Sequence, residues 1–378
     1  MMIGQYHRVR AARILVSLLV LALMGIMPAT SPRAGEDWDH DEELARIRAE
    51  IEATGAHWTA GPTSVSHLTP AEKQAMLGYI PGDEELYGDK PVEMWDPPDR
   101  LQPPAYWNWQ DHGGLTSVKN QGGCGSCWAF AAVAAFESQI LIKDGRYTNL
   151  SEQQSISCNE FGHGCSGGQM ISSYWLFMSP GAIYESCMPY QASDYIPCTQ
   201  DECEVADRIQ GYTAVYPYEE DLKAAVLEAP VAVTMFAPNS LFYYNGGCFQ
   251  YSGNDVPNHA VLLCGWDDNA CGGQGAWLIK NSWGSGWGEG GYGWIRFGDC
   301  RLGLSTHMIE YSPRPRIVLG YDAHAVLDGG NGALDPDETA QVSVTLRNFG
   351  VEDASGVSAT LAALTPGVTV TDPTASFP

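Results

Sequence analysis

Positive charge is scarce in this sequence of 378 residues. It contains 20 Lys and Arg against 45 Asp and Glu, which gives a formal net charge of -25 at pH 7. A chain with this balance is repelled by the phosphates of nucleic acids and by anionic membranes. The composition therefore excludes nucleic acid as an expected partner and favours solubility.

Long hydrophobic runs are also scarce. The one candidate, residues 14–27, follows three arginines and precedes small residues and prolines that continue to Ala34. This run is short for a membrane span. A secretory signal typically has a basic region, then an apolar region, then a region of small residues, and residues 1–34 follow this order. We expect residues 1–34 to be the signal peptide of a secreted, extracellular or periplasmic protein. A retained membrane anchor is the alternative.

Several functional motifs are absent as well. The sequence contains no internal repeat, no glycine-rich phosphate loop and no convincing carboxylate pair for glycosidase chemistry, and no metal or cofactor is predicted. Cysteine, in contrast, is plentiful. Eleven cysteines in a secreted chain indicate disulfide bonds, and the odd number predicts one free thiol.

The candidate for that thiol is Cys127, in the string QGGCGSCWAF of residues 121–130. The glycines before it favour a turn, and the alanine-rich residues after it, 128–137, predict a buried helix. A helix N-terminus carries partial positive charge, which favours the nucleophilic thiolate. The string therefore predicts a cysteine peptidase with Cys127 as its nucleophile.

Cys124 and Cys127 also form a C-x-x-C pair, which occurs in redox motifs and in zinc sites. A redox motif needs a preceding strand, and a zinc site needs a second closely spaced pair of ligands. Cys158 and Cys165, seven positions apart, fit neither requirement well. We favour Cys124 in a disulfide and Cys127 as the reactive thiol.

A catalytic thiol needs a base, and His259 is the candidate among nine histidines. It lies in residues 258–266, which predict a buried strand that would fix the imidazole. Asn281, on the next predicted strand, offers an amide that can accept from one ring nitrogen and leave the other facing the thiol. A histidine with only a packing role is the alternative. Surface or loop positions are expected for His112, His163 and His307.

The strings around Cys127, His259 and Asn281 together resemble the papain-like cysteine proteases. The resemblance implies an α+β fold of two lobes, a helical left lobe and a β-barrel-like right lobe. It also implies that the Gln121 side chain and the backbone N–H of Cys127 stabilise the oxyanion, while His259 acts as base and Asn281 orients it. The activity implied is peptide hydrolysis through an acyl-enzyme.

The resemblance extends to the disulfides and to the substrate cleft. Gly167 and Gly168 would leave an open backbone edge on which an extended peptide binds as an added strand. The implied disulfides are Cys124–Cys165, Cys158–Cys198 and Cys187–Cys203, with three pairings open among Cys248, Cys264, Cys271 and Cys300. The implied substrate-binding residues are Gly167, Gly168, Gln169, Met170, Thr234, Asn258, Ala260 and Trp283, with Leu304 or Ser305. No acidic side chain lines this pocket, so an apolar substrate side chain is expected there.

Residues 35–100 are expected to form a propeptide ahead of a peptidase domain at 101–311, because residues 58–79 resemble the later part of a papain-like propeptide. Between positions 36 and 99 there are 16 Asp and Glu against 4 Lys and Arg. Helices are predicted over residues 41–53 and 69–78, the second with Thr69 as its N-cap in a capping box. The proline-rich residues 97–104 are expected to form an exposed, cleavable linker.

Residues 312–378 differ in composition from the rest, without Cys or Trp and rich in Val, Thr, Ala and Gly. Alternating residues at 341–346 and 357–362 predict half-buried strands. The segment resembles the start of a bacterial immunoglobulin-like β-sandwich, incomplete at this length. One glycine-rich loop, favoured as a solvated acidic turn over a calcium site, contains Asp328, Asn331, Asp335, Asp337 and Glu338.

The function expected from these features is that of a secreted cysteine endopeptidase made as a zymogen. Its partners would be protein or peptide substrates and its own propeptide as inhibitor. An exopeptidase or a peptide ligase of the same fold is one alternative, because small loops at one end of the cleft distinguish these classes. The other is an extracellular binding or adhesion protein whose C-terminal segment contacts a surface or carbohydrate and whose peptidase domain is secondary.

Overall fold

The computed structural model describes residues 38–82, 86–87, 90–91, 93–97, 103–313, 319–327, 337–348, 355–363, 368–372 and 374–377. The chain divides into two units, residues 1–38 and 39–378. The expected signal peptide and the expected boundary at residue 101 lie outside the described residues. Among the helices that are described, none is long and apolar enough to cross a membrane.

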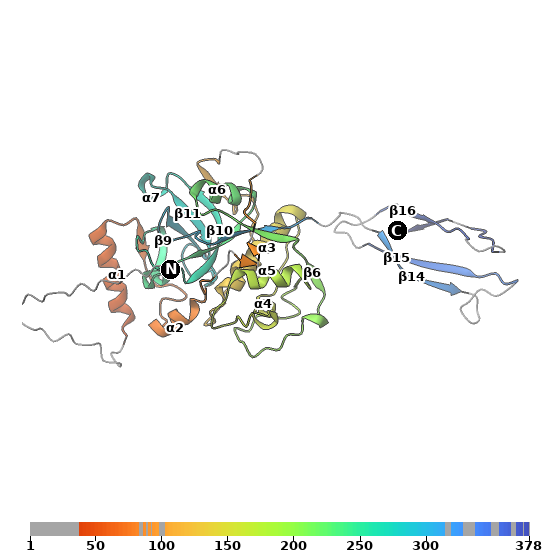
Figure 1. Ribbon diagram of the computed structural model, residues 1–378, viewed down its shortest axis with the longest axis horizontal. Helices are drawn as coiled ribbons and strands as arrows, with labels where there is room; N and C mark the ends of the chain where they lie inside the picture. The colour runs from red at the N-terminus through yellow and green to blue at the C-terminus, as the bar shows by residue number, and fades with distance from the viewer. Residues whose placement is uncertain are drawn as a thin grey trace, which may run out of the picture. The chain divides into compact units, whose positions relative to one another are not determined.

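The first lobe of the peptidase region is helical (Figure 1). Its helices are α3 (Cys127–Asp144), α4 (Glu152–Cys158) and α5 (Met170–Met178). Helix α3 is long because its alanines allow close packing on all sides, and it ends where Gly145 adopts a left-handed conformation with φ 67°. Phe136 of α3 packs on Phe177 of α5 with ring centroids 5.3 Å apart. The predicted buried helix is confirmed.

The second lobe is a nine-stranded sheet in the order β1-β9-β12-β11-β10-β8-β13-β7, with β4 beside β10. All pairs are antiparallel except β9 with β12. Its strands are β1 (Trp58–Ala60), β4 (Tyr106–Asn108), β7 (Gly211–Ala214), β8 (Val231–Met235), β9 (Tyr244–Phe249), β10 (His259–Asp267), β11 (Ala276–Lys280), β12 (Tyr292–Arg296) and β13 (Thr306–Glu310).

The site is positioned where the lobes meet, chiefly where helix α3 contacts strand β10, with further contacts of α3 to β8 and β13 and of α5 to β7. The central strands β8, β10 and β11 are almost wholly buried, as their continuous apolar sequences indicate. Smaller elements flank the sheet and the helices. They are α6 (Glu219–Glu228), α7 (Ala270–Gly273), β5 (Ala182–Ile183), β6 (Val205–Asp207), and the 3-10 helices η1 (Gln200–Glu202) and η2 (Asn239–Tyr243).

The propeptide region contributes α1 (His40–Thr54), strand β1 and α2 (Pro70–Met76). The capping box of α2 is present as predicted, because Thr69 and Glu72 each bond to the other's backbone. The helix ends at Met76, earlier than predicted, where Leu77 leaves the helical conformation. Strand β1 pairs with β9, so the propeptide forms one edge of the peptidase sheet.

The propeptide continues towards the opposite edge of this sheet. Short strands β2 (Leu86–Tyr87) and β3 (Lys90–Pro91) pair with each other. The N–H of Ala214 on β7 then donates to the Glu93 carbonyl at 2.8 Å, and the Ala214 carbonyl accepts from the Trp95 N–H at 2.7 Å. Part of the predicted linker, residues 98–102, lies outside the described residues.

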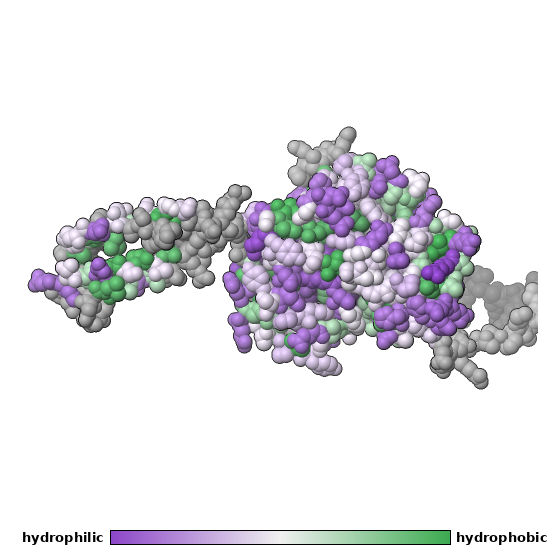
Figure 2. Space-filling view, turned by 180° about the vertical axis from the view of Figure 1, so that it is seen from behind, coloured by the Kyte–Doolittle hydropathy of each residue, from purple (hydrophilic) through white to green (hydrophobic). Residues whose placement is uncertain are grey.

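The C-terminal segment forms two antiparallel pairs, β14 (Leu319–Leu327) with β15 (Gln341–Asn348) and β16 (Val357–Thr360) with β17 (Thr374–Phe377). Both predicted strands are therefore confirmed. Figure 2 shows hydrophobic residues at the surface of this segment, where Leu327 is 56% and Val342 44% exposed. Most of the acidic loop lies outside the described residues. Within those described, no group of three or more His, Cys, Asp or Glu could hold a metal.

The cysteines form four disulfides, namely Cys124–Cys165, Cys158–Cys198, Cys187–Cys203 and Cys248–Cys271. The first three are the pairs that the resemblance implies. The prediction of one free thiol was wrong, since Cys264 and Cys300 are free and buried as well as Cys127. Cys264 is held inside β10, where its thiol faces the Leu278 carbonyl at 3.4 Å rather than another sulfur. Disulfides in this number indicate an extracellular or vesicular compartment.

The position expected for one histidine was also wrong. His307 was expected on the surface or in a loop, but it is buried in β13. Strand β13 lies between β8 and β7, so its side chains meet the core. The rings of Tyr174 and Tyr212 meet His307 edge-on at 5.8 and 5.5 Å.

Candidate active site

Cys127 is the first residue of α3, where the glycine-rich turn gives way to the helix. Its side chain is fully buried, and the backbone groups of Ala260 and Gly78 approach its sulfur closely enough to lower the thiol pKa against the larger effect of burial. Because Ala260 follows His259 on β10, this contact places the thiol beside the candidate base. The structure thus brings together the two elements that the sequence singled out.

His259 is oriented by Asn281, which follows β11 directly. Nε2 of His259 lies 2.9 Å from Oδ1 of Asn281, an oxygen that also accepts from the Ser282 N–H at 2.8 Å. An oxygen can only accept here, so Nε2 carries the proton. Nδ1 of His259 has no hydrogen-bond partner among the described residues, which leaves it available to the thiol. The ring of Trp283 covers the imidazole, with centroids 4.8 Å apart.

Neither partner is charged at neutral pH in this form of the protein. Burial raises the pKa of the Cys127 thiol to about 11. Burial also lowers the pKa of His259 to about 4, against the opposing effect of the Asn281 hydrogen bond. The helix N-terminus therefore does not produce a thiolate here, because the lost hydration outweighs it. A thiolate and an imidazolium require that the cleft be opened to water.

Gln121 presents its side-chain amide to the same cleft. Its Oε1 accepts from the Ser282 hydroxyl at 2.6 Å, which turns the amide nitrogen away from Ser282. That nitrogen donates to the carbonyls of Cys124 and Met76, both at 2.8 Å. The backbone N–H of Gln121 also donates to the Ser282 carbonyl at 2.8 Å. A donor expected to serve an oxyanion is thus engaged with a carbonyl of the propeptide.

Residues 76–80 of the propeptide cross the cleft. The Gly168 N–H donates to the Gly78 carbonyl at 2.8 Å, and the Ile80 N–H donates to the Gly168 carbonyl at 3.1 Å, so the segment lies parallel to this edge. On the other wall, the Tyr79 N–H donates to the Asn258 carbonyl at 3.0 Å. The glycine edge that was expected to be open is therefore covered.

Gly78 lies at the tightest point of this crossing. A Cβ built on it would lie 1.7 Å from the carbonyl oxygen of Gly125, in the turn that precedes Cys127. The obstacle is backbone on both sides, so neither chain can yield by a side-chain rotation. Only glycine fits at this position while the segment remains in place.

The other residues predicted for the cleft lie on both walls. Thr234 of β8 pairs with Ala260 of β10, and its N–H donates to the Ser305 carbonyl at 3.0 Å. Of the two alternatives, Ser305 contacts Thr234 in this way, whereas Leu304 is 46% exposed. On the opposite wall, Met170 is buried, and Gln169 donates from Nε2 to the Ile80 carbonyl at 3.3 Å.

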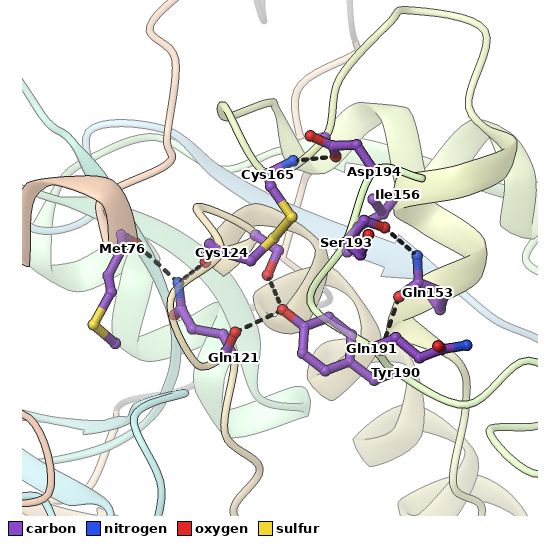
Figure 3. The surroundings of a disulfide bond; sticks show 12 residues. Met76, Gln121, Cys124, Gln153, Ile156, Cys165, Tyr190, Gln191, Ser193 and Asp194 are labelled. Carbon is purple, nitrogen blue, oxygen red and sulfur yellow. Dashed lines mark hydrogen bonds between the residues drawn. A yellow bond between two sulfur atoms is a disulfide. The ribbon is translucent and has the colours of Figure 1, made fainter. Parts of the chain in front are cut away.

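The disulfide Cys124–Cys165 ties the glycine-rich turn to the loop that carries Gly167 and Gly168 (Figure 3). The Cys165 N–H donates to the Asp194 carboxylate at 2.6 Å. The nucleophile turn and the substrate edge are thereby held as one unit. The C-x-x-C string is not a dithiol pair, because Cys124 is committed to Cys165.

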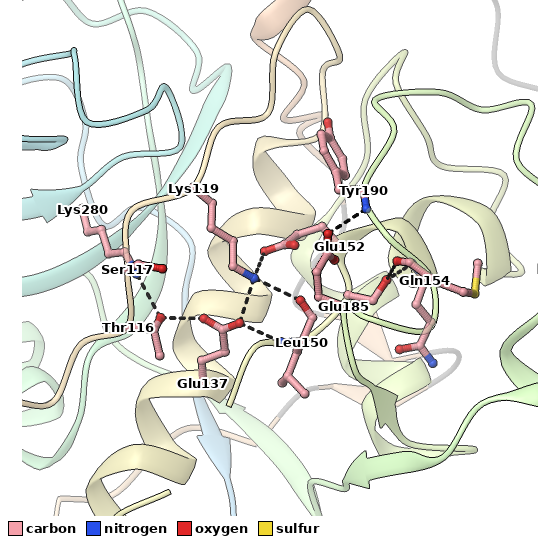
Figure 4. A network of polar contacts seen from close by, with 12 residues as sticks. Thr116, Ser117, Lys119, Glu137, Leu150, Glu152, Gln154, Glu185, Tyr190 and Lys280 are labelled. Carbon is pink, nitrogen blue, oxygen red and sulfur yellow. Dashed lines mark hydrogen bonds and ion pairs between the residues drawn. The ribbon is translucent and has the colours of Figure 1, made fainter. Parts of the chain in front are cut away.

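A buried charge network lies behind the site (Figure 4). Lys119 donates to carboxylate oxygens of Glu137 and Glu152, both at 2.8 Å. Glu137 also accepts from the Thr116 hydroxyl at 2.6 Å, and Lys280 donates to the same hydroxyl at 3.2 Å. Glu137 belongs to α3 and Lys280 precedes Asn281, so the network joins the helix of the nucleophile to the strand of the orienting amide.

Sequence reasoning missed three residues at this site, namely Met76, Tyr190 and Ser282. The Ser282 hydroxyl fixes Gln121, and its position directly after Asn281 was the available signal. The Met76 carbonyl is a backbone group, which no side-chain motif reveals. Tyr190 hydrogen bonds to the turn itself, from a loop more than 60 residues further along the chain, and no local sequence pattern indicates this contact.

Comparison with known proteins gives a family. Residues 103–310 match the model of the papain family of cysteine proteases. Ananain of Ananas comosus is 37% identical over 266 residues, which cover 67% of this chain and 76% of ananain. Papain of Carica papaya is 37% identical over 250 residues, covering 62% of this chain and 68% of papain.

Solved structures of precursors are similar as well. A digestive procathepsin L 3 from the larval midgut of Tenebrio molitor has 30% identity and a TM-score of 0.64, over 72% of this chain and 89% of that one. A recombinant stem bromelain precursor has 30% identity and a TM-score of 0.63, over 72% and 90%. Both matches cover a larger share of this chain than residues 103–310 do. This chain belongs to the papain family of cysteine proteases and is an endopeptidase made as a proenzyme.

Proposed function

We propose that Cys127 is the nucleophile of this endopeptidase and His259 its general base. The observation that carries the proposal is the buried pair of His259 and Asn281, whose Nε2 and Oδ1 atoms lie 2.9 Å apart. Among the described residues, Nδ1 of His259 has no hydrogen-bond partner, and the backbone of the next residue, Ala260, affects the pKa of the Cys127 thiol. Once the cleft opens, the imidazole takes the thiol proton and the thiolate attacks the peptide carbonyl. The imidazolium then gives that proton to the leaving amine.

The oxyanion of the tetrahedral intermediate is stabilised by Gln121 Nε2 and the backbone N–H of Cys127. The carbonyl of Met76 supports this role for Gln121, since an oxygen already accepts from Nε2 at 2.8 Å. Removal of one such donor typically lowers kcat by about 10² to 10³. The Cys127 N–H lies at the start of α3, where backbone N–H groups have no partner within the helix.

The propeptide inhibits by filling the cleft. Residues 76–80 engage Gln121, Gly168 and Asn258 with their backbone, so no substrate can reach these groups. The segment runs along the cleft without interruption, from the contact of Met76 with Gln121 to that of Ile80 with Gly168. A cleft that accommodates a chain on both sides suits internal cleavage of proteins, which supports endopeptidase over exopeptidase action.

The substrate pocket is formed by Met170, Thr234, Ala260 and Ser305, with Gln169 at its rim. None of these side chains is acidic, so the pocket accepts an apolar side chain of the substrate residue that is one removed from the cleaved position. Tyr79 is consistent with this, because it is buried and its backbone lies between Gly168 and Asn258.

Each part of the chain has its own role in this proposal. Residues 1–34 direct export, residues 35–100 form the propeptide, and residues 101–311 form the peptidase domain. The strand pairs within residues 312–378 belong to an immunoglobulin-like module that contacts a surface or carbohydrate. The exposed Leu327 and Val342 support such a contact role, because isolated strand pairs leave apolar side chains uncovered.

The test is replacement of the nucleophile in the full-length chain. Cys127→Ala leaves the four disulfides intact, so we expect a folded, secreted precursor that neither processes itself nor cleaves a denatured protein. Mass spectrometry of products from the active chain should show internal cleavage sites. Peptidase activity retained by the alanine variant, or release of terminal residues only, would contradict the proposal.

A further inference from the structure

The two proposed oxyanion donors, Gln121 and Cys127, stand at the ends of a turn that contains three glycines, at 122, 123 and 125. Glycine-rich backbone has more conformational freedom than any other. Donors aimed at an oxyanion stabilise it only when their positions are fixed before the reaction. The turn must therefore be held by groups outside it.

The disulfide Cys124–Cys165 fixes the middle of the turn, and the hydroxyl of Tyr190 joins its two ends (Figure 3). This hydroxyl donates to the backbone carbonyl of Gln121 at 2.7 Å and lies 2.7 Å from the hydroxyl of Ser126. Because the single phenolic hydrogen is used for Gln121, the Ser126 hydroxyl is the donor in the second bond. One oxygen atom thus bridges the residue of the amide donor and the residue before the nucleophile.

Ser126 shows that this bridge replaces an ordinary helix cap. It occupies the N-cap position of α3, where a serine side chain usually accepts from a backbone N–H of the first turn. Here its side chain makes no cap hydrogen bond. The first N–H groups of α3, including that of Cys127, are consequently not engaged by the Ser126 side chain.

Tyr190 is itself held firmly. Its ring meets Phe130 of α3 edge-on at 4.8 Å, and its N–H donates to the Glu185 carboxylate at 2.8 Å. The next residue, Gln191, donates its N–H to Gln153 of α4 at 3.0 Å. Burial raises the pKa of Tyr190, so its hydroxyl remains a donor throughout the pH range of a peptidase.

We propose that Tyr190 is a positioning residue that sets the geometry of the oxyanion site through its hydroxyl bridge between Gln121 and Ser126. It touches neither substrate nor thiol. Its effect reaches the reaction through the placement of the Gln121 amide and the Cys127 N–H. The inference rests on the oxyanion roles proposed above for those two groups.

The test separates oxyanion stabilisation from thiol reactivity. It uses the mature enzyme that the full-length precursor gives after processing at acid pH. Tyr190→Phe removes the hydroxyl and keeps the ring on Phe130, with Tyr195→Phe as the matched control because Tyr195 is 94% exposed. Three quantities are measured: kcat and KM for a peptide amide, the inhibition constant of a peptide aldehyde, and the rate of alkylation by iodoacetamide. The aldehyde forms a tetrahedral adduct that uses the oxyanion site, whereas alkylation needs only the thiolate.

For Tyr190→Phe we expect kcat to fall about tenfold and KM to stay within about twofold of the wild-type value. Deletion of an oxyanion donor lowers kcat by about 10² to 10³, and a donor that is only displaced should have a smaller effect. The aldehyde should bind weaker by the same factor, and alkylation should not change. The control variant should match the wild type. An unchanged kcat, or an alkylation rate that falls as much as kcat, would overturn the inference.

Two further variants keep the outcomes distinct. Ser126→Ala breaks the bridge from its other end and should show the same pattern, which covers the case in which Tyr190→Phe fails to fold. Gln121→Ala tests the oxyanion role itself. If Gln121→Ala leaves aldehyde binding unchanged, the proposed role of Gln121 fails. If Gln121→Ala weakens the aldehyde but neither bridge variant does, only the role of Tyr190 fails.

Discussion

The side-chain nitrogen of Gln121 donates a 2.8 Å hydrogen bond to the carbonyl oxygen of Met76. One partner belongs to the peptidase and the other to the propeptide. The contact places a peptide carbonyl against the donor that we assign to the oxyanion, while the backbone of Gly78, two residues later, approaches the sulfur of Cys127. The propeptide therefore blocks both the nucleophile and the oxyanion site with backbone groups alone.

The close approach of Gly78 to Gly125 predicts that Gly78→Ala releases the propeptide. The new Cβ would lie 1.7 Å from a backbone oxygen, so the segment must lift out of the cleft. Overpacking of this kind costs about 1–3 kcal/mol. We expect uncleaved Gly78→Ala precursor to hydrolyse a small peptide substrate at least about tenfold faster than uncleaved wild type.

The matched control is Gly82→Ala in the same propeptide. There the nearest atom is Nε2 of Gln169 at 2.1 Å, the far end of a flexible side chain that can move away. This variant should stay as inactive as the wild-type precursor. Equal activity of the two variants would show that the contact with Gly125 does not matter for inhibition.

The His259 and Asn281 pair predicts a graded loss of activity in the processed enzyme. His259→Ala removes the base and should lower kcat/KM by about 10² to 10⁴. Asn281→Ala removes only the acceptor that orients the ring and should cost less. His163→Ala is the control, since its Nδ1 bonds to Ser172 on the helical lobe. The histidine assignment is wrong if His163→Ala is the variant that loses turnover.

The lowered pKa of His259 predicts that acid opens the proenzyme. A histidine whose pKa is lowered to about 4 by burial stabilises the closed form fully above its free value of about 6.5, and this contribution is lost as the pH falls from 6.5 to 4. The shift corresponds to roughly 3 kcal/mol. The melting temperature of the Cys127→Ala precursor, which cannot process itself, should fall steeply in this window. A melting temperature that stays constant over this pH range would contradict the prediction.

Glu43 adds a second, carboxylate contribution. The hydrogen bond from Arg46 lowers the pKa of Glu43, and Asn239 of the peptidase also contacts this carboxylate. The part of this shift that is due to Asn239 depends on docking, so it stabilises the docked propeptide above the free pKa of Glu43 and is lost as the pH falls through the bound pKa. Glu43→Gln should therefore let self-processing begin at a higher pH than wild type.

Glu42→Gln is the control for Glu43→Gln, because Glu42 is exposed on the same helix. Processing is followed by N-terminal sequencing across pH 7 to 4, with a new N-terminus expected near residue 101. If both glutamine variants process at the same pH, the contact of Glu43 with the peptidase is not part of the acid response.

The structure predicts a number of free thiols that differs from the number predicted from the sequence. Unfolding without reductant should expose three thiols, those of Cys127, Cys264 and Cys300. In the folded precursor all three are buried and should resist alkylation. After processing, Cys127 alone should react with iodoacetamide. A single thiol in the unfolded chain would mean that Cys264 and Cys300 are paired.

The residues that we propose as catalytic could be singled out from the sequence because each lies in a contiguous string with a physical signature. Cys127 follows a glycine turn and begins an apolar helix, and His259 opens an unbroken apolar strand. Such local patterns determine both the element and the place of the side chain on it. The capping box of α2 was predictable for the same reason.

The parts that escaped prediction depend on contacts between distant segments. The Tyr190 bridge and the buried position of His307 follow from how loops and strands far apart in the chain pack together. Whether Cys264 and Cys300 form a disulfide depends on which elements lie between them in the fold. The number of cysteines in the sequence does not reveal this. The raised pKa of Cys127 arises from its complete burial in the folded chain, an effect that the helix sequence cannot show.

The most direct test of the account is labelling with a peptidyl epoxide before and after removal of the propeptide. In the processed wild-type chain we predict one adduct, mapped to Cys127, with peptidase activity lost in proportion to labelling. The precursor should not label, because residues 76–80 cover the sulfur. An adduct on another residue, or full activity in a chain labelled at Cys127, would contradict the assignment of Cys127 as the nucleophile.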